Sequence, residues 1–245
     1  MHDALVAGGW GLLAGSSLLL GCGLGLWGVT SRRIIGLTMA FGAGVLISSV
    51  AVELMEEAFS RGGLDAAAIG LLAGGGAYFL ADRLVSRHSR HRKRSQGQQS
   101  GSAAHGLVIG ALMDGVPESA AIGLTLLGGD RVSLVMVAAV FLSNVPEAMS
   151  ASAGMRKAGH KPAFILAMWG GVTVLSGFAA AAGYAFLDGA SGDLIGGLQA
   201  FAGGAVLTML ASTMMPEAYE EGGSWVGLLT TGGFLAAFAL AKLQA

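Results

Sequence analysis

Residues 41–63 read FGAGVLISSVAVELMEEAFSRGG, and residues 201–223 read FAGGAVLTMLASTMMPEAYEEGG. The two stretches match at a constant offset of 160 residues, which aligns Glu57 with Glu217 and the closing Gly-Gly of each stretch. Each is apolar over about 20 residues, the length that a helix needs to cross the hydrocarbon core of a bilayer. The match predicts two copies of one membrane-helix unit, with chance similarity between glycine-rich helices as the alternative.

Further apolar stretches raise the predicted number of membrane helices to eight, all in one domain. Their approximate bounds are 4–29, 34–58, 64–86, 104–128, 132–154, 162–187, 194–218 and 225–243. The matching stretches lie in the second and seventh helices, an odd number of helices apart, so the copies should cross the membrane in opposite directions. Helices 1–3 and 6–8 then form an inverted repeat around helices 4 and 5. Helices 3 and 8 also share a Gly-Leu-Leu start, at Gly70 and Gly227. Inverted repeats are typical of transporters, whose substrate sites lie near the bilayer midplane.

The composition agrees with an all-α integral membrane protein. Of the 245 residues, 53% are hydrophobic and 12% are charged, whereas soluble domains carry about 25% charged residues. An ordinary soluble enzyme is therefore disfavoured. The net charge of −1 offers no basic surface for nucleic acid. The single cysteine, Cys22, excludes an internal disulfide.

The distribution of Lys and Arg predicts the orientation of the helices. The segment 87–103 reads RHSRHRKRSQGQQSGSA, and its cations indicate a flexible cytoplasmic loop. Both termini then lie outside the cytoplasm, and we expect a multi-pass protein of the cell (inner) membrane. The chain begins Met-His-Asp with no positive segment before the first apolar stretch, so no cleaved signal peptide is expected.

Helices 4 and 5 carry two related polar motifs. Residues 114–118 read DGVPE and residues 143–147 read SNVPE, so Val-Pro-Glu recurs at an offset of 29. A carboxylate near the middle of a membrane helix costs about 2.5–3.5 kcal/mol even on the most lenient scale. Asp114 and Glu118 share one helix face because they are four residues apart, as do Ser143 and Glu147. A bound cation, protons or a water-filled path must offset their cost; a kinked helix pair whose acids are protonated or bonded to neighbours is the alternative.

The residues around these motifs lead to two structural expectations. Each proline should kink its helix and leave the carbonyl four residues earlier, of Met113 or Leu142, without a helical partner. The small residues nearby should let helices 4 and 5 approach each other closely; they are Gly115, Ser119, Ala120, Ala148 and Ser150.

The chain resembles the ZIP family of divalent-metal transporters. The likeness extends over the whole chain in its helix order and is sharpest at 114–118, 143–147 and Pro216-Glu217-Ala218. It implies eight helices arranged 3+2+3, external termini, a cytoplasmic loop between helices 3 and 4, and a metal site on helices 4 and 5. By this resemblance the main ligands are Asp114, Glu118, Asn144 and Glu147, with Ser143 in the same site.

The chain also departs from the family pattern. Asp114 stands where the family has a histidine, and Gly115 stands where it has an asparagine. The stretch 176–180 lacks the helix 6 glutamate that some bacterial members use for a second metal, so one site is expected. Zinc is the expected substrate, and an all-oxygen site also admits iron(II), manganese or cadmium. The metal would be cargo, and no cofactor is expected.

Two further residues, Glu53 and His105, are candidate ligands on the path that the metal takes to or from the site. Glu53 is either a ligand on the entrance path or a rim residue, and His105 is either an exit ligand or an interfacial histidine. Glu56 and Glu57 are expected to face the external headgroups.

The sequence leaves one rival function open. The chain is either a divalent-metal carrier or a ZIP-like protein that carries another solute or acts as a non-transporting regulator. An intramembrane hydrolase is disfavoured because the chain has no HExxH motif and no histidine in the middle of a predicted helix, so no enzyme activity is expected. The expected partners are the metal ion and membrane lipid, with a homodimer left open.

Overall fold

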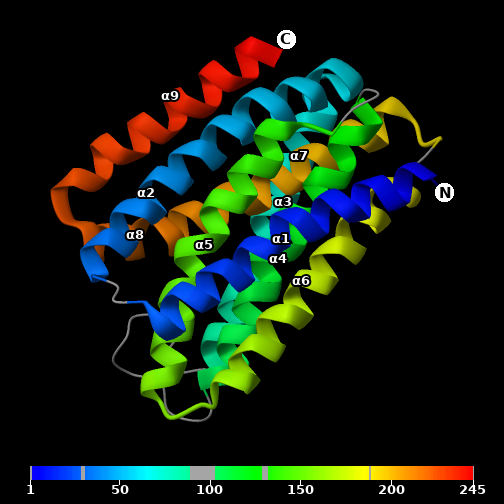
Figure 1. Ribbon diagram of the computed structural model, residues 1–245. Helices are drawn as coiled ribbons and strands as arrows, with labels where there is room; N and C mark the ends of the chain where they lie inside the picture. The colour runs from blue at the N-terminus through cyan, green and yellow to red at the C-terminus, as the bar shows by residue number, and fades with distance from the viewer. Residues whose placement is uncertain (1, 29–30, 89–102, 129–131, 188, 245) are drawn as a thin grey trace.

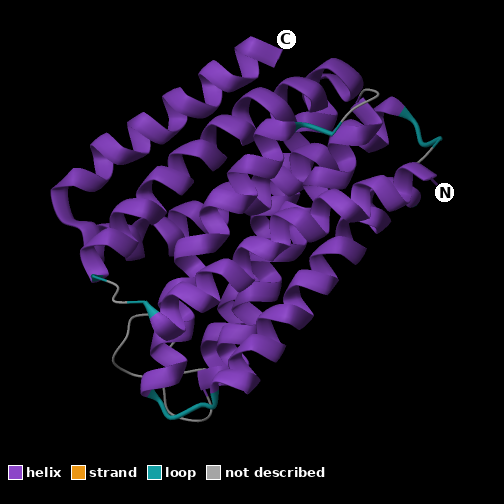
Figure 2. Ribbon diagram, viewed as in Figure 1, coloured by secondary structure: helices purple, strands orange, loops and turns teal. Residues whose placement is uncertain are grey.

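The computed structural model describes residues 2–28, 31–88, 103–128, 132–187 and 189–244. All regular secondary structure in these ranges is helical (Figure 2). Most of the predicted loop 87–103 and the side chains of His105 and Asp114 lie outside the described part. The elements in chain order are α1 (His2–Trp27), α2 (Arg32–Ser49), η1 (Val50–Met55), α3 (Glu56–His88), α4 (Ala103–Gly128), α5 (Leu134–Lys157), α6 (Pro162–Ala185), α7 (Gly192–Met209), η2 (Leu210–Met214), α8 (Met215–Gly222), η3 (Gly223–Trp225) and α9 (Val226–Gln244).

Several of these elements are long and apolar enough to cross a membrane. Within the described residues there are five such stretches, and they are His2–Trp27, Arg32–Val85, Leu134–Lys157, Pro162–Ala185 and Gly192–Leu243. Their lengths, from 24 to 54 residues, suggest a multi-pass membrane protein.

The two longest stretches are each interrupted by one glycine. They contain 54 and 52 residues, and a straight helix of that length would measure about 80 Å, far more than the hydrocarbon core of about 30 Å. Gly63 has φ 67° and Gly223 has φ 69°, a left-handed conformation that glycine adopts without steric cost. The chain therefore leaves the helix at these two positions.

The local backbone repeats at the offset of 160 residues. A π-helical segment occupies Val50–Met55 in one copy and Leu210–Met214 in the other, and the glycine breaks at 63 and 223 follow at equivalent positions. Pro216 follows the second π segment, but a glutamate, Glu56, follows the first. The proline is therefore not needed for the π segment.

The two copies pack against each other in an antiparallel and equivalent way. A Cβ placed on Gly36, near the start of α2, would meet Ala218 and Gly222 of α8, and one placed on Gly196, near the start of α7, would meet Ala58 and Gly62 of α3. Because 36, 58 and 62 become 196, 218 and 222 at the same offset, the two contacts are the same contact made twice.

Glycines set the register of α3 on α7 and of α9 on α2. A Cβ on Gly74 would overlap the carbonyl group of Phe201, and one on Gly233 would overlap that of Phe41. Gly74 therefore corresponds to Gly233, and the predicted match of Gly70 with Gly227 was wrong by two positions. A Gly-Leu-Leu triplet recurs easily in a chain with 42 glycines, whereas close backbone contact fixes one register.

The remaining helices α1, α4, α5 and α6 are joined by polar as well as close contacts. Thr173 Oγ1 of α6 donates a hydrogen bond to the Gly15 carbonyl of α1 (2.9 Å), and Trp169 Nε1 donates to Ser152 Oγ of α5 (2.8 Å). Such bonds between helices are typical of membrane bundles. In Figure 1 the start of α1 and the end of α9 lie toward the same end of the bundle.

Candidate functional site

Two carboxylate side chains are buried on the central helices. Glu118 of α4 is 1% exposed and Glu147 of α5 is 6% exposed. Glutamates are almost never fully buried unless they are paired, and both residues take part in polar interactions within the protein. Their burial is the main feature that a folded core of apolar helices does not explain.

The two polar residues that precede Glu147 are buried, and one of them, Ser143, lies where α5 meets α2. Asn144 is 4% exposed and Ser143 is 1% exposed. The Ser143 hydroxyl donates to the Val140 carbonyl of its own helix at 3.0 Å, so only its oxygen lone pairs are open to a ligand. A Cβ on Gly42 of α2 would lie 3.1 Å from Ser143 Cα and 3.3 Å from the Leu142 oxygen. The carbonyl that Pro146 leaves without a helical partner therefore faces α2.

The structure describes only part of the expected ligand set. Asp114 and His105 lie on α4, but their side chains are outside the described residues. Among the described side chains, no group of three or more His, Cys, Asp or Glu is arranged to hold a metal ion. Glu118, Ser143, Asn144 and Glu147 are all buried, and the complete ligand set stays a prediction.

The predicted close approach of α4 and α5 through their small residues was wrong. A Cβ on Gly115 would lie 3.8 Å from Ser176 Oγ and 4.0 Å from Val172 Cγ1 of α6, and the Ala120 backbone lies against Gly183 of α6. On α5, the Ala148 methyl group lies against Gly21 of α1. The reason is that Gly183 of α6 and Gly21 of α1 stand opposite Ala120 and Ala148 and let those backbones come close.

Both motif helices continue through their prolines. Pro117 lies inside α4 and Pro146 lies inside α5, and each helix continues on both sides of its proline. The kink expected at each proline stays a prediction.

A third Pro-Glu carboxylate reaches the same region, and the sequence interpretation left it out of the site. Ser150 Oγ of α5 donates to Glu217 Oε1 of α8 at 3.4 Å. Ser150 is three residues after Glu147, so the two lie on neighbouring positions of one helix face. The signal in the sequence was the likeness of Pro216-Glu217 to the motifs of α4 and α5.

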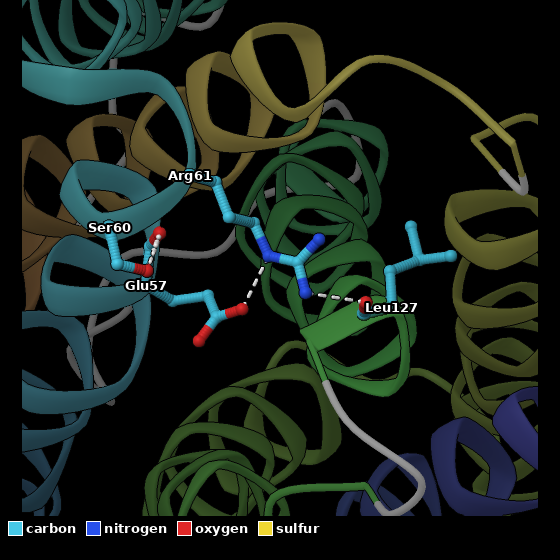
Figure 3. A network of polar contacts seen from close by, with 4 residues as sticks. All are labelled: Glu57, Ser60, Arg61 and Leu127. Atoms are coloured by element: carbon cyan, nitrogen blue, oxygen red, sulfur yellow. Dashed lines mark hydrogen bonds and ion pairs between the residues drawn. The ribbon is translucent and has the colours of Figure 1, made fainter.

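The three glutamates near the start of α3 differ in their exposure and in their contacts. Glu53 lies in η1 and is half-buried, which leaves both readings of its role open. Glu56 is exposed, and whether it and Glu57 face the external headgroups stays a prediction. Glu57 forms an ion pair with Arg61, whose Nη2 donates to the Leu127 carbonyl of α4 at 2.7 Å (Figure 3). The pair is possible because Arg61 follows one helical turn after Glu57 and can reach it.

Compared with known proteins, the chain matches no protein-family model and no curated protein sequence.

Proposed function

We propose that the protein carries divalent metal cations across a membrane through a site between α4 and α5, in the manner of the ZIP transporters that its Pro-Glu motifs resemble. The observation that carries this proposal is the burial of Glu118 and Glu147 beside prolines on neighbouring apolar helices. Two anions in such a place are costly, and a cation with hard, oxygen-preferring chemistry offsets that cost. Asp114 and Asn144 complete the proposed ligand set.

The arrangement of the spans supports a transporter. In the proposed topology, the stretches 32–85 and 192–243 each contain two spans separated at Gly63 or Gly223, which with α1, α4, α5 and α6 makes eight. The antiparallel, equivalent contacts of Gly36 and Gly196 support an inverted repeat. Such repeats place a substrate site near the midplane and let the protein expose it to either side in turn.

Metal uptake into proteoliposomes tests this proposal. Wild-type protein should take up zinc or manganese, and the double variant Glu118→Gln/Glu147→Gln should take up none, because it keeps the shape of both side chains and loses both charges. Glu56→Gln is the matched control, since Glu56 is exposed, and it should transport as wild type does. Uptake by the double variant at the wild-type rate would exclude the site.

A further inference from the structure

One buried amide side chain lies outside the motifs of α4 and α5. Gln199 of α7 is fully buried, with 0% of its surface exposed. Its Nε2 and Oε1 atoms both lack a hydrogen-bond partner among the described residues. A buried polar group without a partner costs the free energy of removing it from water. In a folded protein such a group calls for an explanation, and a bound ion or water is one.

The other copy of the repeat shows that packing does not require an amide at this position. At the offset of 160 residues Gln199 corresponds to Met39 of α2, which is also fully buried. The backbones around the two positions make equivalent contacts, since Gly36 and Gly196, three residues earlier, pack in the same way. A side chain without N–H or carbonyl groups therefore fills the equivalent place, and packing does not explain the amide of Gln199.

The contacts of Arg61 place Gln199 near Glu118 along the bundle. The Arg61 side chain donates to the Leu127 carbonyl of α4, and a Cβ on Gly192 of α7 would lie 2.9 Å from the Arg61 carbonyl oxygen. Because α7 begins beside the end of α4 and packs against α4, it runs back along that helix. Gln199 is seven residues after Gly192. Glu118 is nine residues before Leu127, so at about 1.5 Å per residue the two levels differ by about 3 Å.

The first copy gives the same level independently. The contact of α2 with α5 at Gly42 lies three residues after Met39 on α2 and four residues before Glu147 on α5. The two helices run in opposite directions, since the start of α2 and the later part of α5 both contact α8. Met39 is therefore level with Glu147. At the offsets of 160 and 29 residues, this pair corresponds to Gln199 and Glu118.

Gln199 also lies on a side of α7 that faces other helices of the bundle. Gly196 packs against α3, and a Cβ on Gly203 would meet side chains of η1. Gln199 lies between these glycines on one helix face. Ala202, three residues after Gln199, belongs to the same buried cluster as Ile122 of α4. The amide therefore lies among α3, η1 and α4.

We infer that Gln199 is a further ligand of the proposed cation site and contributes its amide oxygen from α7, beside Glu118. The inference rests on the proposed function and adds one ligand to it. Amide oxygens are neutral donors that hard divalent cations accept, and the NH₂ group of the same amide can donate to a carboxylate. Because the first copy has Met39 at this position, only one of the two repeat units contributes to the site.

Equilibrium binding of manganese(II) by the purified protein tests this role. Gln199→Met introduces the residue that the first copy has, and it should weaken binding by about tenfold or more, since groups around a metal typically contribute about 10–100-fold to its affinity. Gln199→Glu keeps an oxygen in the same place. It should bind at least as tightly as wild type at about pH 8, where a carboxyl group is normally ionised.

A control variant in the same helix removes a polar group that already has a partner. The Thr208 hydroxyl donates to the Gly204 carbonyl at 2.9 Å, and it lies on the side of α7 that faces Gly75 of α3. Thr208→Val keeps the shape of the side chain and should bind manganese as wild type does.

Thermal unfolding in the presence of a chelator gives a second readout. Gln199→Met should unfold at a temperature no lower than that of wild type, because it removes a buried amide without a partner. A lower unfolding temperature would show that the amide has stabilising partners in the metal-free protein, and it would overturn the inference.

The outcomes separate this inference from the proposed function. If Glu118→Gln loses manganese while folded Gln199→Met binds it as wild type does, Gln199 is not a ligand and the proposed function stands. The same conclusion follows if Gln199→Glu binds as weakly as Gln199→Met. No binding by wild type would contradict the proposed function, and the inference with it.

Discussion

At the scale of single residues, Asp114 is expected to determine the metal preference. It stands where the ZIP pattern has a histidine, and carboxylate oxygen suits harder cations than imidazole nitrogen does. Asp114→His removes one negative charge, which weakens binding of every cation, but it supplies a nitrogen donor that zinc prefers over manganese. The ratio of zinc to manganese affinity should therefore rise, even if both affinities fall.

Competitive uptake of the two metals by wild type and Asp114→His, measured side by side, gives that ratio. An unchanged ratio would mean that Asp114 is not a ligand, and the site would then consist of Glu118, Asn144 and Glu147.

The residues of the site could be predicted from the sequence only where local spacing determined them. Glu118 and Glu147 lie in the middle of apolar helices, where a carboxylate almost always faces the interior of the helix bundle. Both side chains are buried in the structure. The hydrogen bond from Arg61 to the Leu127 carbonyl and the Ser150–Glu217 contact join helices that are far apart in the chain. Neither could be derived from spacing along one helix, because each depends on how the helices are placed in space.

At the scale of the helices, close backbone contact at glycine should dominate stability. A Cβ at Gly233 would overlap the Phe41 carbonyl group, whereas one at the adjacent Gly232 would meet nothing within 4 Å. Gly233→Ala should destabilise the protein by about 1–3 kcal/mol, the usual cost of overpacking. Gly232→Ala should stabilise it by up to about 1 kcal/mol, because alanine favours a helix more than glycine does.

Thermal unfolding of the two variants in the same detergent measures the difference. Equal midpoints for Gly233→Ala and Gly232→Ala would contradict the register of α9 on α2. That register was missed in the sequence because a glycine that touches backbone and a glycine that faces lipid look the same there.

The helices themselves were predicted better than their irregularities. Each predicted apolar stretch overlaps a helical part of the structure, since a run of about 20 apolar residues indicates a membrane helix on composition alone. The π segments at 50–55 and 210–214 were not predicted, because an extra residue in a helical turn leaves the hydrophobic pattern almost unchanged. The Gly-Gly pairs were noticed as a match, but their role as helix breaks depends on the positive φ of Gly63 and Gly223.

At the scale of the whole molecule, the proposed eight spans require both chain ends on one side and the loop 87–103 on the other. In a Cys22→Ala background, His2→Cys and Gln244→Cys should react with an impermeant maleimide added outside intact cells. Ser95→Cys should react only after the membrane is made permeable. Reaction of Ser95→Cys in intact cells, or chain ends that react from opposite sides, would contradict the inverted repeat.

The central claim is that Glu118 and Glu147 together hold a divalent cation, and equilibrium metal binding by the purified protein tests it most directly. Wild type should bind one ion per chain. Glu118→Gln and Glu147→Gln should each bind it at least about 100-fold more weakly, because losing a ligand costs more than the 10–100-fold loss typical of residues that support one. Glu56→Gln, an exposed acid changed in the same way, should bind as wild type does. Wild-type affinity in the Glu118 and Glu147 variants, or no binding by wild type, would contradict the account.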